Sequence, residues 1–226
     1  TATKYFRAVV TNTPCPSVIS NVVTVTVNSL PVITINPALT AQTLCQDPTL
    51  TANSYSVSAT AGSGTISSYS WYRNANNSNI GGTFLVTNTS SSGSNSYLPS
   101  RTTASEFYYY CIVTNSNGCI ATSSPSGSVK VIATPTITTN GVINTVTAGT
   151  TSATLPYTAT TSSPTSYSID WDTIAENNNL VDQPNTVFSF AAGGGNLTGI
   201  VIPATVNTGI TYNGVMTIRN ATGCTT

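Results

Sequence analysis

The chain has 226 residues, with 6 basic and 6 acidic side chains, no net charge and no histidine. Only 5% of its residues are charged, against about 25% in an average globular domain. This composition excludes a nucleic-acid binder that works by counterion release, and it excludes catalysis by Ser-His-Asp or Cys-His groups. The aromatic side chains, 11 Tyr, 5 Phe and 2 Trp, indicate a folded chain rather than a disordered one.

Short segments rich in β-branched and aromatic residues predict strands along the whole chain. Each is bounded by Gly, Pro, Asn or Ser, and the clearest are 22–27, 65–72, 108–114, 128–132 and 215–219. Helical periodicity is not convincing anywhere. The best helical candidate, 173–180, is short and interrupted by three Asn residues. The sequence therefore predicts an all-β fold.

An internal repeat organises these strands. Cys15, Cys119 and Cys224 are spaced by 104 and 105 residues, and each follows an asparagine by three or four positions. A Pro-led strand at Pro31 returns 104 residues later at Pro135. A period of about a hundred residues is usual for an immunoglobulin-type sandwich, so the chain is predicted to be a string of tandem Ig-like β-sandwich modules.

The phase of the repeat sets the predicted boundaries. Residues 1–29 match only the last two strands of a module, residues 30–133 form a complete module, and residues 134–226 form a module that lacks its last strand. We call these the first, middle and last repeats. Because a two-stranded hairpin is marginal in water, the first repeat is expected to need strands from upstream sequence or from another chain. The chain is thus expected to be an interior window of a longer, processed polypeptide.

Several motifs in this sequence resemble those of a known group of proteins. The last repeat contains Leu-Pro-Tyr at 155–157, Tyr-Ser-Ile-Asp-Trp-Asp at 167–172 and Thr-Tyr-Asn-Gly at 211–214. The middle repeat contains Leu-Cys-Gln-Asp-Pro-Thr at 44–49 and Asn-Ser-Asn-Gly-Cys at 115–119. These resemble modules repeated in giant secreted cell-surface proteins of Bacteroidota, which include gliding-motility adhesins. The resemblance implies an exported surface protein that has no catalytic residues.

The resemblance to these tandem modules, together with the absence of a cysteine pair at the close spacing of a zinc site, favours an oxidising compartment. Cys111 has the Tyr-x-Cys spacing of an Ig F strand, which makes Cys45–Cys111 one possible bridge. Cys45 lies early for a B-strand cysteine, and in the resembling modules the early cysteine pairs with the Gly-Cys one. That resemblance favours Cys45–Cys119, with Cys111 as a buried free thiol. Cys15 would then have its partner outside the sequence, and Cys224 would be free or pair outside its own module.

Four of the six acidic residues lie within 13 positions, namely Asp170, Asp172, Glu176 and Asp182. In a strand, Asp170 and Asp172 would share one face, which could seed a calcium site of carboxylate and carbonyl oxygens. The EF-hand pattern is missing, and a solvated strand face with Asx turns is the alternative. Apart from this calcium possibility, no metal or other cofactor is expected.

One short motif suggests a modification. Asp-Thr-Ile at 172–174 resembles the O-glycosylation signal of the same bacterial phylum, which makes Thr173 the candidate acceptor. The motif is only three residues long, so an ordinary loop threonine is the alternative.

Three consecutive tyrosines are the candidate ligand-contact residues. Strand alternation predicts that Tyr109 points inward near Trp71, while Tyr108 and Tyr110 face outward. An exposed pair of tyrosine rings could stack on a sugar or pack on a neighbouring module. The alternative is a ladder of residues with high strand propensity.

The predicted function is that of a repeat or stalk segment in a large cell-surface adhesin or extracellular filament of a Gram-negative bacterium. Its expected partners are neighbouring modules of the same chain and laterally associated copies, with no nucleic acid and no membrane span. Uncharged edge strands lack the lysines that normally block lateral pairing. The alternative function is a carbohydrate-binding module that uses exposed tyrosines to bind surface glycans, and an enzyme is not expected.

Overall fold

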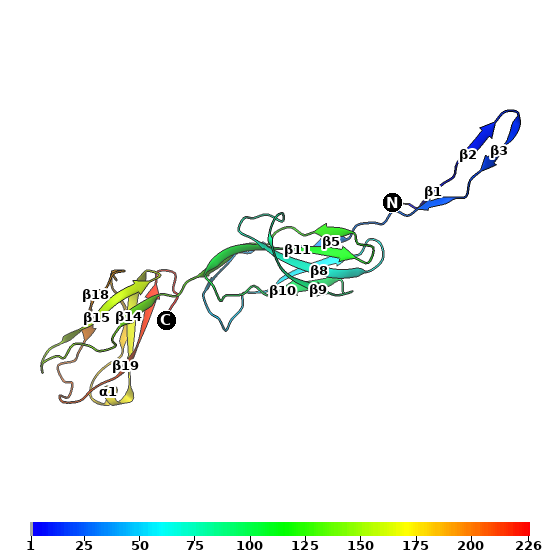
Figure 1. The fold of residues 1–226 in the computed structure, drawn as a ribbon. Helices are drawn as coiled ribbons and strands as arrows, with labels where there is room; N and C mark the ends of the chain where they lie inside the picture. Colours follow the sequence, from blue (N-terminus) through cyan, green and yellow to red (C-terminus); the bar gives the residue numbers. More distant parts are fainter. Residues whose placement is uncertain (1) are drawn as a thin grey trace. The chain divides into compact units, whose positions relative to one another are not determined.

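The computed structural model describes residues 2–226, and their regular secondary structure is almost entirely β-strand (Figure 1). The all-β class and the sandwich-like sheets predicted from the sequence are confirmed. The chain divides into two compact units. Unit 1 contains the chain up to Gln42, Thr51–Ser100 and Ser105–Lys130, and unit 2 contains Thr43–Leu50, Arg101–Ala104 and Val131–Thr226. Two short segments of the middle repeat therefore group with the last repeat.

The first repeat is a two-stranded antiparallel ribbon. Strand β1 (Lys4–Phe6) pairs with β4 (Val23–Val25), and β2 (Val9–Asn12) pairs with β3 (Cys15–Ile19). Neighbouring residues on a strand point to opposite faces, so consecutive exposed apolar residues leave both faces uncovered. The exposed large apolar side chains are Tyr5, Phe6, Val9, Val10, Val18, Ile19, Val22, Val23, Val25 and Val27.

The middle repeat forms two sheets. One has the strand order β10-β7-β5, and the other has the order β6-β13-β11-β8-β9, with β12 also pairing β11. The strands are β5 (Val32–Ile35), β6 (Gln42–Cys45), β7 (Tyr55–Thr60), β8 (Ile66–Asn74), β9 (Thr83–Thr89), β10 (Ser94–Tyr97), β11 (Ser105–Asn115), β12 (Ile120–Thr122) and β13 (Val129–Ile132).

The core of unit 1 is aromatic. Trp71 on β8 and Tyr55 on β7 are buried, and the Trp71 ring stacks on Tyr97 of β10 with centroids 5.8 Å apart. The indole Nε1 of Trp71 donates a 2.8 Å hydrogen bond to Oδ1 of Asn95, also on β10. Because β8 and β10 belong to different sheets, this bond fixes one sheet against the other.

The last repeat also forms two sheets, with the orders β14-β15-β18 and β17-β16-β19; β14, β15 and β18 are labelled side by side in Figure 1. Buried Tyr167, Leu197, Ile200 and Ile218 lie at the centre of its core. The elements are β14 (Thr136–Thr139), β15 (Ser152–Thr161), β16 (Pro164–Trp171), α1 (Thr173–Asn177), β17 (Gln183–Val187), β18 (Gly195–Val201) and β19 (Gly214–Asn220).

A buried glutamine fixes these two sheets against each other. Gln183 on β17 donates from Nε2 to the carbonyl of Gly199 at 3.0 Å and accepts from the backbone N–H of Val201 at 3.0 Å, both on β18. The same Nε2 donates to the hydroxyl of Tyr167 at 2.8 Å. A buried side-chain amide is tolerated when its polar atoms are bonded in this way.

The five predicted strand segments all overlap observed strands, namely β4, β8, β11, β13 and β19. The helical candidate 173–180 does form a helix, but only over the five residues of α1. Asp172 caps its N-terminus by accepting from the backbone N–H of Ala175 at 2.8 Å, and Asn178 is the C-cap. The interruption by asparagines thus limits the helix to little more than one turn.

Candidate functional site

The most distinctive chemistry in the chain is a disulfide between Cys45 and Cys224. Their Cα atoms are 5.4 Å apart, and 179 residues separate them in the sequence. Cys45 belongs to the middle repeat and Cys224 to the last repeat, but both lie in unit 2. The disulfide therefore covalently joins two repeats of the sequence.

The predicted Cys45–Cys119 bridge is wrong, and so is the alternative Cys45–Cys111, because Cys111 and Cys119 are both free. Asn115 lies four residues before Cys119, and its side-chain amide donates to the carbonyl of Ser29 at 3.1 Å and to that of Ala61 at 2.9 Å. Ser29 immediately precedes the middle repeat, so this loop lies next to the start of that repeat.

Cys45 belongs to unit 2, where the N–H of the next residue, Gln46, donates to the carbonyl of Ile132 at 2.7 Å. Cys119 belongs to unit 1. The two cysteines of the predicted bridge therefore fall in different compact units.

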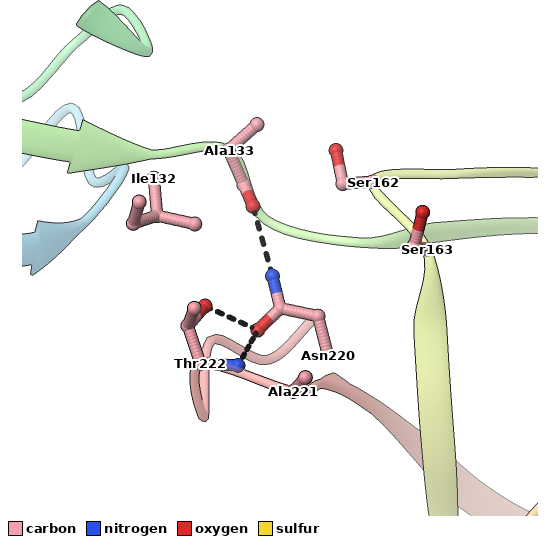
Figure 2. A pocket seen from close by; sticks show the side chains of 7 residues that line it. All are labelled: Ile132, Ala133, Ser162, Ser163, Asn220, Ala221 and Thr222. Carbon is pink, nitrogen blue, oxygen red and sulfur yellow. Dashed lines mark hydrogen bonds between the residues drawn. The ribbon is translucent and has the colours of Figure 1, made fainter.

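Cys224 is positioned by a five-residue loop that begins at Asn220. Oδ1 of Asn220 accepts from the backbone N–H of Thr222 at 3.1 Å, and Nδ2 donates to the carbonyl of Ala133 at 3.3 Å (Figure 2). The same Oδ1 accepts from the backbone N–H of Cys224 at 3.0 Å. Gly223 has a φ of 89°, which only glycine adopts without strain. We call residues 220–224 the Asn220 loop.

Cys45, the other cysteine of the disulfide, is held through its backbone carbonyl by Arg101. The guanidinium donates from Nε at 3.0 Å and from Nη2 at 2.7 Å to the carbonyl of Cys45. The carbonyl of Arg101 accepts from the N–H of Asp47 at 3.0 Å, and Gln46 donates from Nε2 to the carbonyl of Thr102 at 2.8 Å. These bonds join segments 43–50 and 101–104, which we call the Arg101 clamp.

The Asp47 carboxylate shapes its own turn within this clamp. Its Oδ1 accepts from the hydroxyl of Thr49 at 2.6 Å and from the N–H of Thr49 at 2.8 Å. These two hydrogen bonds to the ionised form, the side-chain one first, hold the pKa of Asp47 below its ordinary value. The turn starts just past the cysteine, so it helps to fix the direction in which the chain leaves the disulfide.

A depression of about 390 Å³ lies beside the Asn220 loop (Figure 2). Seven residues line it: Ile132, Ala133, Ser162, Ser163, Asn220, Ala221 and Thr222. None of these seven side chains is charged, and the hydroxyl of Thr222 already donates to Oδ1 of Asn220 at 2.7 Å. The depression therefore lies where residues 132–133 meet the Asn220 loop.

Tyr109 points inward, as predicted. It is buried, and its ring lies 6.0 Å from that of Tyr55 and 5.5 Å from that of Tyr97, measured between centroids. Desolvation raises its pKa to about 12. The tyrosine is therefore part of the aromatic core of unit 1.

The predicted exposure of Tyr110 is wrong. Its side chain is only 3% exposed, and its ring stacks on Tyr72 with centroids 5.2 Å apart. The N–H of Gly82 donates to its hydroxyl at 3.1 Å, and a Cβ at Gly82 would lie 2.8 Å from the ring, so the loop lies directly on it. Tyr108 is half-buried. The exposed pair needed for a sugar platform is not formed.

Two of the four predicted calcium ligands have separate structural roles. Asp172 caps α1, and Asp182 accepts from the backbone N–H of Trp171 at 2.9 Å. Asp170 and Glu176 are exposed. Within residues 2–226, no three His, Cys, Asp or Glu side chains gather in a way that could hold a metal ion. The calcium possibility has no support in this structure.

Two further candidate residues differ in accessibility. Cys111 is a buried free thiol, as predicted, and desolvation raises its pKa to about 12. Thr173 is exposed at the start of α1, and its O-glycosylation stays a prediction.

Across the part of the chain that the structure describes, no helix is both long and apolar enough to cross a membrane.

Sequence reasoning missed two components of the joint, the Arg101 clamp and the partner of Cys224. The asparagine that precedes each repeated cysteine was the available signal for the Asn220 loop. Arg101 gave no signal beyond being one of 6 basic residues in the chain.

A family described as a domain of unknown function (DUF8696) matches residues 1–29. No curated protein matches the sequence.

Several solved structures of multi-module proteins are similar to this chain. A titin A168–A169 structure has 14% identity and a TM-score of 0.37, with 86% of this chain and 94% of that chain covered. Fibronectin(III)-like modules of Clostridium thermocellum CbhA have 15% identity and a TM-score of 0.29, covering 87% and 89%. A 1.5-MDa bacterial ice-binding adhesin has 17% identity and a TM-score of 0.35, covering 96% and 69%.

Proposed function

We propose that this chain is a segment of an extended extracellular stalk, in which consecutive β-sandwich repeats are clasped to each other by disulfides. The observation that carries the proposal is the Cys45–Cys224 bridge, which joins the middle and last repeats of the sequence. A disulfide within one sandwich would stabilise that sandwich alone. A disulfide between repeats also restrains the joint, which is useful where a string of modules must transmit force.

The setting follows from the same bond. Disulfides persist in oxidising compartments and are rare in the cytosol, which supports an extracellular location. The chain also carries few charges, and the residues that the structure describes include one ion pair, Lys130 Nζ to Glu106 Oε2 at 3.7 Å, which is exposed. A surface of this kind is insensitive to the salt concentration of the surroundings.

The first repeat supports the idea of an array. Its ribbon exposes ten large apolar side chains, from Tyr5 to Val27, on both faces. A two-stranded ribbon is marginal alone and needs further strands to bury such residues. We propose that residues 1–29 complete a sandwich whose other strands come from elsewhere in the array.

The finer predictions about biology stay predictions. These are the origin in Bacteroidota, the part in gliding, lateral association into a filament or sheath, and export from a Gram-negative cell. The carbohydrate-binding alternative is weakened by the burial of Tyr110.

Single-molecule pulling between the two ends of the chain tests the proposed mechanical role. With the disulfide intact, force passes from residue 45 directly to residue 224, so residues 46–223 lie in a closed loop and carry no load. In a reducing buffer, unfolding of the same residues should release about 600 Å of additional contour length, at about 3.4 Å per residue for 179 residues. A Cys224→Ser variant should behave like the reduced protein, and Cys119→Ser should behave like the oxidised one. Equal extension of oxidised and reduced protein would contradict the proposal.

A further inference from the structure

The free Cys119 lies in a loop that is built like the one holding the disulfide-bonded Cys224. Oδ1 of Asn115 accepts from the N–H of Cys119 at 3.0 Å, as Oδ1 of Asn220 does from the N–H of Cys224 at 3.0 Å. The N–H of each asparagine donates to the carbonyl of the cysteine four residues on, at 2.9 and 3.0 Å. The glycine before each cysteine has a positive φ, 77° at Gly118 and 89° in the last repeat.

Both loops also form a hydrogen bond to the residue immediately before their own repeat. Nδ2 of Asn115 donates to the carbonyl of Ser29 at 3.1 Å, and Nδ2 of Asn220 donates to the carbonyl of Ala133 at 3.3 Å. Ser29 and Ala133 occupy equivalent positions, 104 residues apart in the sequence. Each loop therefore presents its cysteine at the start of its repeat, on the side from which the preceding chain arrives.

The Asn220 loop shows which group a cysteine in such a loop bonds to. Cys224 is bonded to Cys45, which is the last residue of the early strand β6 of the preceding repeat. Cys119 has an equivalent loop but no bonded sulfur, and it is partly exposed. The separation of 179 residues found for Cys45–Cys224 would carry the partner of Cys119 beyond the N-terminal end of this sequence.

We propose that Cys119 is the receiving half of a second disulfide, made with the early cysteine of the repeat that precedes the middle one. The bridges then form a ladder in which each complete repeat can hold two, one to the repeat before it and one to the repeat after it. The inference rests on the proposed function only in taking this chain as part of a longer array.

Formation of this bridge needs an oxidised dithiol carrier as the two-electron acceptor. The Cys119 thiolate attacks one carrier sulfur, which breaks the carrier's S–S bond and forms a mixed disulfide. The thiolate of the upstream cysteine then attacks the Cys119 sulfur, and the carrier leaves as a dithiol. The two cysteines lose two electrons and two protons, and the carrier gains both.

The test is peptide mapping without reduction on the full-length protein from its natural source. We expect a peptide containing Cys119 to be linked to an upstream peptide, while the Cys45–Cys224 link serves as the internal control. Iodoacetamide should label Cys119 in the native protein only after reduction, whereas it should label Cys119 directly in the 226-residue chain. Replacement of Cys119 by Ser in the full-length protein should expose one new upstream thiol, and Cys111→Ser, the matched control, should expose none.

The outcomes separate this inference from the proposed function. A free Cys119 in a protein that contains upstream repeats, or a Cys119 bonded to Cys15 or Cys111, overturns the ladder but leaves the stalk. A natural protein without an upstream repeat overturns both.

Discussion

Removal of Cys224 should destabilise the last repeat far more than removal of the neighbouring free cysteines. The disulfide closes a chain segment of 179 residues, and loop closure of that size lowers the entropy of the unfolded chain by an amount worth about 5 kcal/mol at 25 °C. If only the last repeat unfolds, the loop that becomes free is roughly 90 residues, and the stabilisation is still about 4.6 kcal/mol. A single domain is typically stable by about 5–15 kcal/mol, so Cys224→Ser should leave this repeat marginal.

Urea unfolding followed by tryptophan fluorescence measures the effect on each repeat. Trp71 is buried in unit 1 and Trp171 in unit 2, so a Trp71→Phe background isolates the signal of the last repeat. With a slope of about 2 kcal/mol per molar urea, Cys224→Ser should lower the midpoint by about 2.5 M. Reductant should bring the parent protein to the same midpoint.

Cys119→Ser is the matched control, because it removes a cysteine that forms no disulfide and therefore closes no loop. It should leave the midpoint reported by Trp171 unchanged. If Cys224→Ser and Cys119→Ser gave the same midpoint, or if reductant had no effect on a protein whose bridge is intact by mass mapping, the loop-closure reasoning would be refuted.

Four further results are expected. Asn220→Ala should cost about 2–3 kcal/mol in urea unfolding, because it leaves the buried N–H of Cys224 and the part-buried N–H of Thr222 without an acceptor. Asn220→Asp, which keeps the acceptor oxygens, should cost less, and equal losses would contradict this role. Between pH 9 and 12 the stability of unit 1 should fall, since the unfolded chain loses the proton of Cys111 near pH 9.0 while burial raises the pKa of that thiol to about 12 in the folded state. In Cys111→Ala this loss of stability should be smaller. Tyr109, whose pKa is also raised to about 12, should account for part of the loss that remains. A pH profile identical to that of the parent protein would exclude Cys111 as a contributor. Asp172→Ala should cost about 1 kcal/mol by removing the N-cap of α1, whereas Asp170→Ala should be neutral in the same unfolding experiment. Raising NaCl from 0.1 to 1 M should change the unfolding free energy by less than about 0.5 kcal/mol, because the ion pair in the described residues is exposed; a larger loss would indicate electrostatic contributions that the structure does not contain.

The sequence was sufficient to predict the all-β class and where several strands form. Strand propensity depends on local composition, so segments such as 65–72 and 215–219 were recognisable without any knowledge of packing. The repeated cysteines were also recognisable as equivalent. Which cysteine Cys45 meets was not predictable, because equivalence within a repeat does not reveal with which compact unit a segment packs. Cys119 lies in unit 1, whereas Cys45 lies in unit 2 together with Cys224.

The burial of Tyr110 was missed for a different reason. Alternation along a strand assigns it to the outer face of the sheet, but it does not say whether that face is open. Here a loop covers the face: Gly82 rests on the Tyr110 ring, and the side chain of Asn79 donates to the carbonyl of Ser123 at 2.9 Å. Such long-range contacts between a loop and a sheet leave no periodic signal in the sequence.

The position of the disulfide affects what happens when a protease cuts the chain. A peptide bond cut at any one place between Gln46 and Gly223 leaves the two fragments covalently joined through Cys45 and Cys224. Exposed loops, such as the one that contains Ile80, can therefore be nicked without separating the two ends of the chain. A nicked sample would run as one species on a non-reducing gel and as two after reduction. For a protein outside the cell, the bridge thus preserves the continuity of the chain even when its backbone is broken.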